Sequence, residues 1–229
     1  MLVTAAVCPH PPLLVPELAA GAAAELDDLR ARCHAAVERL AEARPQLLVV
    51  VGADTGVRAS SFAPWGRDVV VDVPEPLPLP LLVGAWLTRG TTRSFVAVAP
   101  EMDASECAEL GAELADGADR VALLVMGDGS ARHTEKAPGY LDPCAAPYDA
   151  RVAQALGSAD SAALGALDPA EAEGLLVAGR PAWQVLAGAT ADTGFEVVDP
   201  WHGAPYGVGY HVVTWRRKEV GVTTANSGR

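Results

Sequence analysis

Short apolar runs alternate with longer alanine-rich segments along the chain, and the two kinds of segment differ in period. The runs are rich in valine and leucine, whereas the alanine-rich segments repeat their apolar residues at helical spacing. This alternation predicts an α/β fold, a single-domain sandwich with a central mixed sheet and helices on both faces. We expect strands at Leu2–Val7, Leu47–Val51, Val69–Val73, Phe95–Val98, Val121–Met126, Leu175–Val177 and Gly207–Trp215. We expect helices at Glu17–Ala43, Pro80–Arg89, Asp103–Ala115, Pro147–Ala155, Pro169–Gly174 and Ala182–Thr190.

Acidic residues and prolines mark several boundaries of these elements. In "DASE", at Asp103–Glu106, and "DPAE", at Asp168–Glu171, an acidic N-cap residue precedes a Glu by three positions, which predicts two capped helix starts. Prolines remove backbone donors from Asp72–Pro80, so we expect an extended crossing between layers there. The chain shows no internal repeat or charged linker, which predicts one domain over residues 1–216 and a loose polar tail over 217–229.

Composition and charge disfavour several classes of function. Half of the 229 residues are hydrophobic, yet the longest apolar runs are far shorter than the roughly 20 residues that span a membrane. The formal net charge is −12, with no basic cluster apart from Arg216–Lys218, so we expect no nucleic-acid partner. The start "MLVTAAV" lacks a basic region, and the four cysteines lack Cys-x-x-Cys spacing. Both features predict a soluble cytoplasmic protein with reduced thiols and no membrane partner.

Polar residues with useful chemistry follow the ends of the predicted strands. His10 follows the first strand, Asp54 the second, and Asp128 the strand at Val121–Met126, with His133 close behind; His202 lies just before the last strand. Ligands of open α/β sheets bind beyond the carboxyl ends of the strands. Each residue taken alone is more typical of a cap or a turn. Together, two histidines and one or two aspartates at strand ends favour the two-histidine, one-carboxylate face that binds Fe(II).

Four segments carry a resemblance to a known family. They are "CPHPPLLVPEL", "LLVVVGADTG", "MGDGSARHTEKAPGYLDPCAAPYDARVAQAL" and "HGAPYGVGYHVV". Their order and spacing are similar to those of the B-type, catalytic subunit of class III extradiol ring-cleavage dioxygenases, a group structurally akin to the Memo family. The resemblance spans Leu2 to Trp215. It implies a single α/β domain that uses non-haem Fe(II) to cleave the ring of a small catechol-type substrate beside its two hydroxyls.

The resemblance implies metal ligands at three positions, and the chain departs from the pattern at two of them. His10 matches the first metal histidine. Asp54 stands where the second histidine is expected, and Gly203 stands where the metal carboxylate is expected, with His202 one residue earlier. We therefore expect His10, Asp54 and His202 to be the metal ligands if the site has been redistributed. Iron is the expected metal, zinc is an alternative, and the absence of any metal is a third outcome.

The catalytic base also departs from the family pattern. Ala131 stands at the position of the family's base, and His133 follows two residues later, so we expect His133 to be the acid or base and Asp128 to orient its loop. Two hypotheses follow. The chain is an extradiol dioxygenase with an altered ligand set, or it is a catalytically silent or repurposed relative that binds a small molecule or a protein. A homodimer is the commonest assembly for such a protein.

Overall fold

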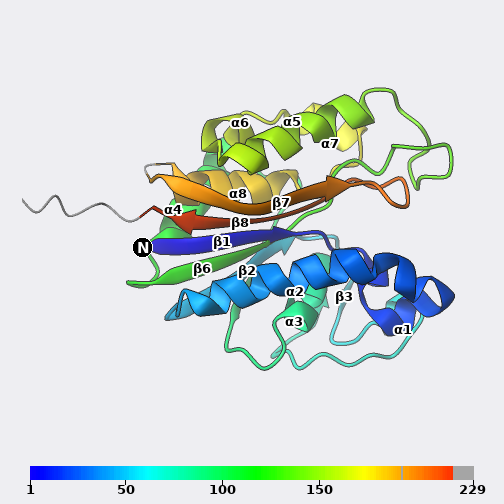
Figure 1. The fold of residues 1–229 in the computed structure, drawn as a ribbon, viewed down its shortest axis with the longest axis horizontal. Coiled ribbons are helices and arrows are strands. Elements are labelled where there is room, and N and C mark those ends of the chain that lie inside the picture. Colours follow the sequence, from blue (N-terminus) through cyan, green and yellow to red (C-terminus); the bar gives the residue numbers. More distant parts are fainter. Residues whose placement is uncertain (192, 219–229) are drawn as a thin grey trace, which may run out of the picture.

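A central six-stranded sheet with helices on both faces forms the fold, as the sequence predicts (Figure 1). The computed structural model describes residues 1–191 and 193–218. The sheet strands are β1 (Leu2–Cys8), β2 (Leu47–Ala53), β5 (Ser94–Val98), β6 (Val121–Met126), β7 (Phe195–Gly203) and β8 (Tyr210–Arg217). The α-helices are α1 (Pro16–Ala19), α2 (Asp27–Glu42), α3 (Leu79–Leu87), α4 (Ala104–Ala115), α5 (Ala145–Ser158), α6 (Ser161–Gly165), α7 (Pro169–Gly174) and α8 (Arg180–Thr190). Short elements are η1 (Pro12–Leu14), η2 (Ala20–Leu26), η3 (Ala63–Trp65), β3 (Arg58–Ala59) and β4 (Leu77–Pro78).

The order of the strands brings distant parts of the chain to one edge of the sheet. The order is β5-β2-β6-β1-β8-β7, in which β5, β2, β6 and β1 are parallel and β8 is antiparallel to both β1 and β7. The carboxyl ends of the parallel strands therefore share an edge with the start of β8. In the register of β1 and β6, Cys8 pairs with Met126. The residues that follow these two strands consequently emerge side by side.

Each face of the sheet packs against its own layer of helices. Alternate side chains of a strand point to opposite faces, so Val50 and Leu124 join the cluster that contains Leu29 and Leu40 of α2. The neighbouring residues of the same strands join a second cluster with Trp183 of α8 and side chains of α4 and α5. In Figure 1, α2 and α3 lie below the sheet, whereas α4, α5 and α8 lie above it. Burial on both faces explains why β6 is an unbroken apolar run and why β1 is apolar except for Thr4.

Most predicted strands are confirmed, and two are wrong. Val69–Val73 forms no regular strand; only an isolated bridge joins Val70 to Ser61. In Leu175–Val177, Leu175 and Val177 are buried in the core, whereas Leu176 is exposed. Leu175 is the C-cap of α7, and the amide of Val177 donates to Ala172. Short apolar runs do not distinguish strands from buried helix ends.

Strand β7 was not predicted, because its sequence, "FEVVDPWHG", contains an Asp-Pro pair that is atypical of a strand. The register shifts between Val198 and Trp201, and Asp199 has a φ of 46°. An irregularity of this kind accommodates the proline, whose nitrogen cannot donate to the ladder. Helix α6 was also not predicted; Asp160 caps it by accepting from the amide of Ala163.

The predicted helix at Glu17–Ala43 is divided into α1, η2 and α2, and the left-handed Ala20 (φ 46°) ends the first of these. The capping box at Asp103 is confirmed, and Asp168 accepts from the amide of Glu171 as predicted. The proline segment Asp72–Pro80 contains more regular structure than expected, since β4 pairs with β3 and α3 begins at Leu79.

The predicted domain limit falls one residue before the end of β8. The predicted tail begins with Arg217 of that strand, and its residues 219–229 lie outside the described part of the chain. None of the helices within the described residues is long and apolar enough to cross a membrane.

Candidate functional site

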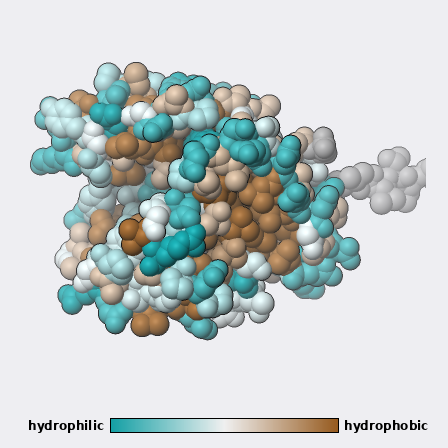
Figure 2. All heavy atoms as spheres, turned by 180° about the vertical axis from the view of Figure 1, so that it is seen from behind, coloured by the Kyte–Doolittle hydropathy of each residue, from teal (hydrophilic) through white to brown (hydrophobic). Residues whose placement is uncertain are grey.

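Two glycine-rich segments pair with each other at the carboxyl edge of the sheet. The amide of Gly129, after β6, donates to the carbonyl of Gly209 at 2.7 Å, and the amide of Gly209 donates back to Ser130 at 2.8 Å. The amide of His133 donates to Gly207 at 3.1 Å, which extends the pairing toward the surface. The molecular surface is hollowed at this end, between the two layers of helices (Figure 2). These segments thus form a rigid floor at the position where α/β sheets bind ligands.

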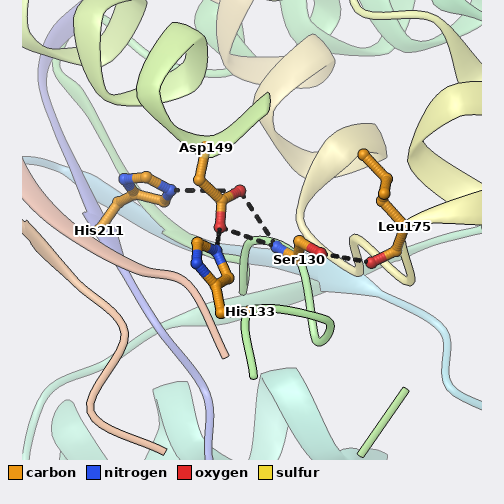
Figure 3. Close-up of polar contacts among 5 residues, drawn as sticks. All are labelled: Ser130, His133, Asp149, Leu175 and His211. Carbon is orange, nitrogen blue, oxygen red and sulfur yellow. Dashed lines mark hydrogen bonds and ion pairs between the residues drawn. The ribbon is translucent and has the colours of Figure 1, made fainter. Parts of the chain in front are cut away.

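Asp149, from α5, is the centre of a polar cluster on this floor (Figure 3). Its side chain is 8% exposed, and both carboxylate oxygens accept from the amide of Ser130 at 3.1 Å. Nε2 of His133 lies 2.6 Å from Oδ2, and Nε2 of His211 lies 4.0 Å from Oδ1. An ionised carboxylate only accepts hydrogen bonds, so Nε2 of His133 must be the donor. The neutral ring of His133 therefore keeps an unprotonated Nδ1.

Glycines at two positions leave room for the Asp149 carboxylate. A Cβ at Gly209 would lie 1.8 Å from Oδ2 of Asp149, and a Cβ at Gly129 would lie 2.5 Å from Oδ1. Both distances are far below van der Waals contact. Because the carboxylate is confined between two backbone segments and the Ser130 amide, its position is fixed by sterics as well as by hydrogen bonds.

Ser130 supports the cluster through its backbone. Its hydroxyl is fully buried and donates to the carbonyl of Leu175 at 2.8 Å, while its amide holds Asp149 (Figure 3). The amide of Ala131 also donates to Leu175, at 3.3 Å. The hydroxyl is thus committed to joining the loop after β6 to the end of α7.

His10 and Asp128 form a second histidine–aspartate pair at the same edge. The amide of His10 donates to Oδ1 of Asp128 at 2.7 Å, and the His10 Nδ1 lies 3.4 Å from the same oxygen. The carbonyl of Asp128 accepts from the amide of Gly179, at the start of α8. Burial raises the pKa of Asp128, and the charge and amide of His10 oppose this rise. The contacts of Asp128 therefore join the ends of β1 and β6 to the start of α8.

Asp54 and His202, the other two predicted metal ligands, do not join His10. Asp54 accepts from the amide of Gly56 at 3.0 Å and forms an ion pair with Arg58; these two contacts lower the pKa of its carboxyl. His202 is exposed and lies opposite His211 in the β7–β8 register, with ring centroids 6.5 Å apart. Across residues 1–191 and 193–218, no three His, Cys, Asp or Glu side chains form a group that could hold a metal ion. The three predicted donors therefore do not form a single metal-binding group in the described part of the chain.

The strand-end pattern in the sequence points to neither Asp149 nor His211. His211 is buried, at 2% exposed, with the edge of its ring against Trp183. One signal for Asp149 is present in the sequence, because it occupies a position on the apolar face of α5. The buried residues of that helix are Ala145, Tyr148, Asp149, Val152, Ala155 and Leu156. An acid at the i+4 position of such a face is unusual, since buried carboxylates need partners.

A second hollow, away from this site, is chemically different. It measures about 970 Å³ and lies at the opposite edge of the sheet, and its described lining includes Arg120, Arg217 and Lys218 but none of the five histidines. The imidazoles of His10, His133 and His211 instead lie at the carboxyl edge, with the carboxylates of Asp128 and Asp149.

Comparisons with known proteins give a fold-level likeness. No family model matches the chain, and no curated protein matches it. Among solved structures, the chain is similar to an uncharacterized protein from Escherichia coli K12, with 15% sequence identity and a TM-score of 0.49. The alignment covers 93% of this chain and 99% of that one.

Proposed function

We propose that this protein binds a small catechol-type molecule at the carboxyl edge of its sheet and that His133 accepts a phenolic proton from it. The observation that carries the proposal is the 2.6 Å contact between Nε2 of His133 and Oδ2 of the buried Asp149. The protein would thus be a repurposed relative of the extradiol dioxygenases, one that retains acid–base chemistry.

The geometry of the pair suits a general base. Asp149 holds the Nε2 proton, so the lone pair of Nδ1 is available to accept a proton. The side chain of His133 is 15% exposed, compared with 8% for Asp149, so the imidazole is the member of the pair nearer to solvent. When Nδ1 takes a proton, the imidazolium gains a charge-assisted hydrogen bond to the carboxylate. Proton transfer by a positioned side chain contributes roughly 10²- to 10⁴-fold to a reaction rate.

The class of ligand is supported by the resemblance described above. In the family that this sequence resembles, the substrate is a catechol whose hydroxyl loses a proton to a nearby histidine. His133 stands two residues from that position, and Asp149 lies within the matching segment "YDARV". A phenol is a suitable acid because its anion is stabilised by a nearby imidazolium.

The experiment uses 4-nitrocatechol, whose visible spectrum distinguishes its neutral and ionised forms. The protein is titrated anaerobically with a chelator present, at a pH where the free probe is largely neutral. We expect binding with a shift to the ionised spectrum for the wild type, and binding without the shift for His133→Gln. His34→Gln is the matched control. His34 lies in α2 and packs against Trp86 of α3, so its substitution should leave the shift unchanged. An absence of binding would contradict the ligand class, and an unchanged shift in His133→Gln would contradict the base.

Iron-dependent ring cleavage is the second candidate function. The observation in its favour is His10, which is 5% exposed and whose Nδ1 makes no hydrogen bond within the described chain. Its test is Fe(II) loading followed by desalting and elemental analysis, with His10→Ala in parallel. Retention of about one metal per chain in the wild type alone would support this candidate. Failure of the wild type to retain iron would favour the metal-independent proposal.

We also propose a cytoplasmic location and a homodimer. The location is supported by the four cysteines, which are all free thiols, three of them buried. Cell fractionation and sedimentation velocity test the two proposals separately.

A further inference from the structure

We propose that His211 is a positioning residue, whose imidazole holds the Asp149 carboxylate in the orientation that fixes the tautomer of His133. The inference deepens the proposed function and rests on it. His133 is the residue that meets the ligand, whereas His211 would act on it only through Asp149. The two imidazoles contact different oxygens of one carboxylate, as Figure 3 shows.

The groups around the two oxygens of the Asp149 carboxylate oppose its rotation. His133 contacts Oδ2, and the Ser130 amide lies between the two oxygens, at 3.1 Å from each. Within the part of the chain that the structure describes, Oδ1 accepts no hydrogen bond from a side chain. Nε2 of His211 lies 4.0 Å from it. Rotation of the carboxylate away from His133 is therefore opposed on the Oδ1 side by an imidazole and by the Gly129 backbone.

Burying His211 has a cost in free energy. The residue is 2% exposed, and neither ring nitrogen makes a hydrogen bond within residues 1–191 and 193–218. A buried polar group without a partner is unfavourable, and an apolar side chain of the same shape would avoid that cost. A polar ring is favourable at this position only if its electrostatic interaction with the Asp149 carboxylate offsets the cost of burying it. The ring of Trp183 packs edge-on, at 84° and 5.6 Å, and limits the orientations of the imidazole.

Charged and titratable groups from three elements surround His211. Asp149 faces it from α5, Asp128 interacts with it from the loop after β6, and His202 stacks at 6.5 Å from β7. The carboxylates of Asp149 and Asp128 thus face the buried His211 ring. Among the described residues, the other imidazole stacked on this ring is that of His202, which is exposed to solvent. The local field favours an N–H of His211 that points toward Asp149.

The experiment reads the tautomer of His133 directly, with no ligand present. Long-range ¹H–¹⁵N spectra are recorded for the wild type, His211→Phe and His211→Gln at a pH where the His133 ring is neutral. Phe retains the packing against Trp183 but has no donor, whereas Gln retains an N–H group. We expect an Nε2-protonated His133 in the wild type and in His211→Gln, and about a tenfold loss of that preference in His211→Phe.

Two results would overturn the inference. If His211→Phe folds, as judged by circular dichroism, and His133 keeps its tautomer, His211 only packs. If His211→Phe does not fold, the wild-type spectrum of His211 decides, because an unprotonated Nε2 would present a lone pair and not an N–H dipole to the Asp149 carboxylate. Both measurements are independent of 4-nitrocatechol, so failure of the proposed function would be seen separately as an absence of binding or of ionisation.

Discussion

Asp149 and Asp54 are both carboxylates near the carboxyl edge of the sheet, but their surroundings differ in origin. The partners of Asp54 lie two and four residues along the chain, and its side chain is 30% exposed. The hydrogen-bond partners of Asp149 are His133 and Ser130, which lie 16 and 19 residues away, and its side chain is 8% exposed. A carboxylate held by its own turn stabilises that turn. A buried carboxylate held by several distant elements can control the chemistry of a neighbouring imidazole.

The largest expected effect comes from closing the space around Asp149. In Gly209→Ala, the new Cβ would lie 1.8 Å from Oδ2 of Asp149. We expect a loss of about 3 to 5 kcal/mol in the free energy of unfolding, because the displaced carboxylate also loses its buried partners. Urea denaturation measures the loss.

Gly157→Ala is the matched control for this substitution. Gly157 lies in α5, the helix that carries Asp149, and a Cβ there meets nothing within 4 Å. We expect a gain of about 0.5 to 1 kcal/mol from the better helix propensity of alanine. Equal stabilities of Gly209→Ala and Gly157→Ala would show that the space around the Asp149 carboxylate is not tightly packed.

Asp149→Asn should have the next largest effect. In asparagine, one of the two carboxylate oxygens is replaced by an NH2 group. This group is a donor, and it would face the Ser130 amide at the Oδ1 position, or both that amide and Nε2 of His133 at the Oδ2 position. We expect about 2 to 3 kcal/mol of destabilisation, the usual cost of leaving a buried hydrogen-bonding group unsatisfied. Thermal and urea unfolding measure it. A variant as stable as the wild type would remove the contrast with Asp54.

Asp128 gives a prediction about the dependence of stability on pH. Its folded-state pKa is raised from 3.8 mainly by burial, so the native state keeps a proton that the unfolded state releases. The contribution of Asp128 to stability is thus complete below 3.8 and is lost as the pH rises through the raised value. We expect the free energy of unfolding of Asp128→Asn, measured relative to wild type, to increase over that pH window. A constant difference between the two proteins would contradict the raised pKa.

Asp54→Asn should have the smallest effect, below about 0.5 kcal/mol, because surface ion pairs such as that with Arg58 contribute little. The measurement is urea denaturation at low and high salt. A loss as large as that of Asp149→Asn would mean that Asp54 has a structural role beyond its turn.

Much of the fold could be predicted from the sequence, because the strands of the parallel core are buried on both faces. The apolar run of β6, and that of β1 with Thr4 as its single polar residue, identify these strands directly. Edge strand β7 could not be predicted in the same way, because it is partly exposed and contains Asp-Pro. Its pairing with β8 is set by tertiary contacts that override local propensity.

The candidate site could be predicted only in part. The expectation that ligands bind beyond the carboxyl ends of the strands pointed to His10, Asp128 and His133. These residues lie at the carboxyl edge of the sheet, since the ends of parallel strands necessarily meet there. That expectation could not show that Asp54 would be held by its own turn. Nor could it show that Asp149, from a helix, would lie over the loop after β6, because that contact depends on how α5 packs.

The most direct test of the account is the protonation of His133 in the wild-type protein. A long-range ¹H–¹⁵N spectrum, assigned by comparison with His133→Gln, shows which ring nitrogen carries the proton when the ring is neutral. Only five histidines contribute to the spectrum. The account predicts a single tautomer with Nε2 protonated and Nδ1 free to accept a proton. A protonated Nδ1 with a bare Nε2 would contradict it, because His133 could then neither donate to Asp149 nor act as the base.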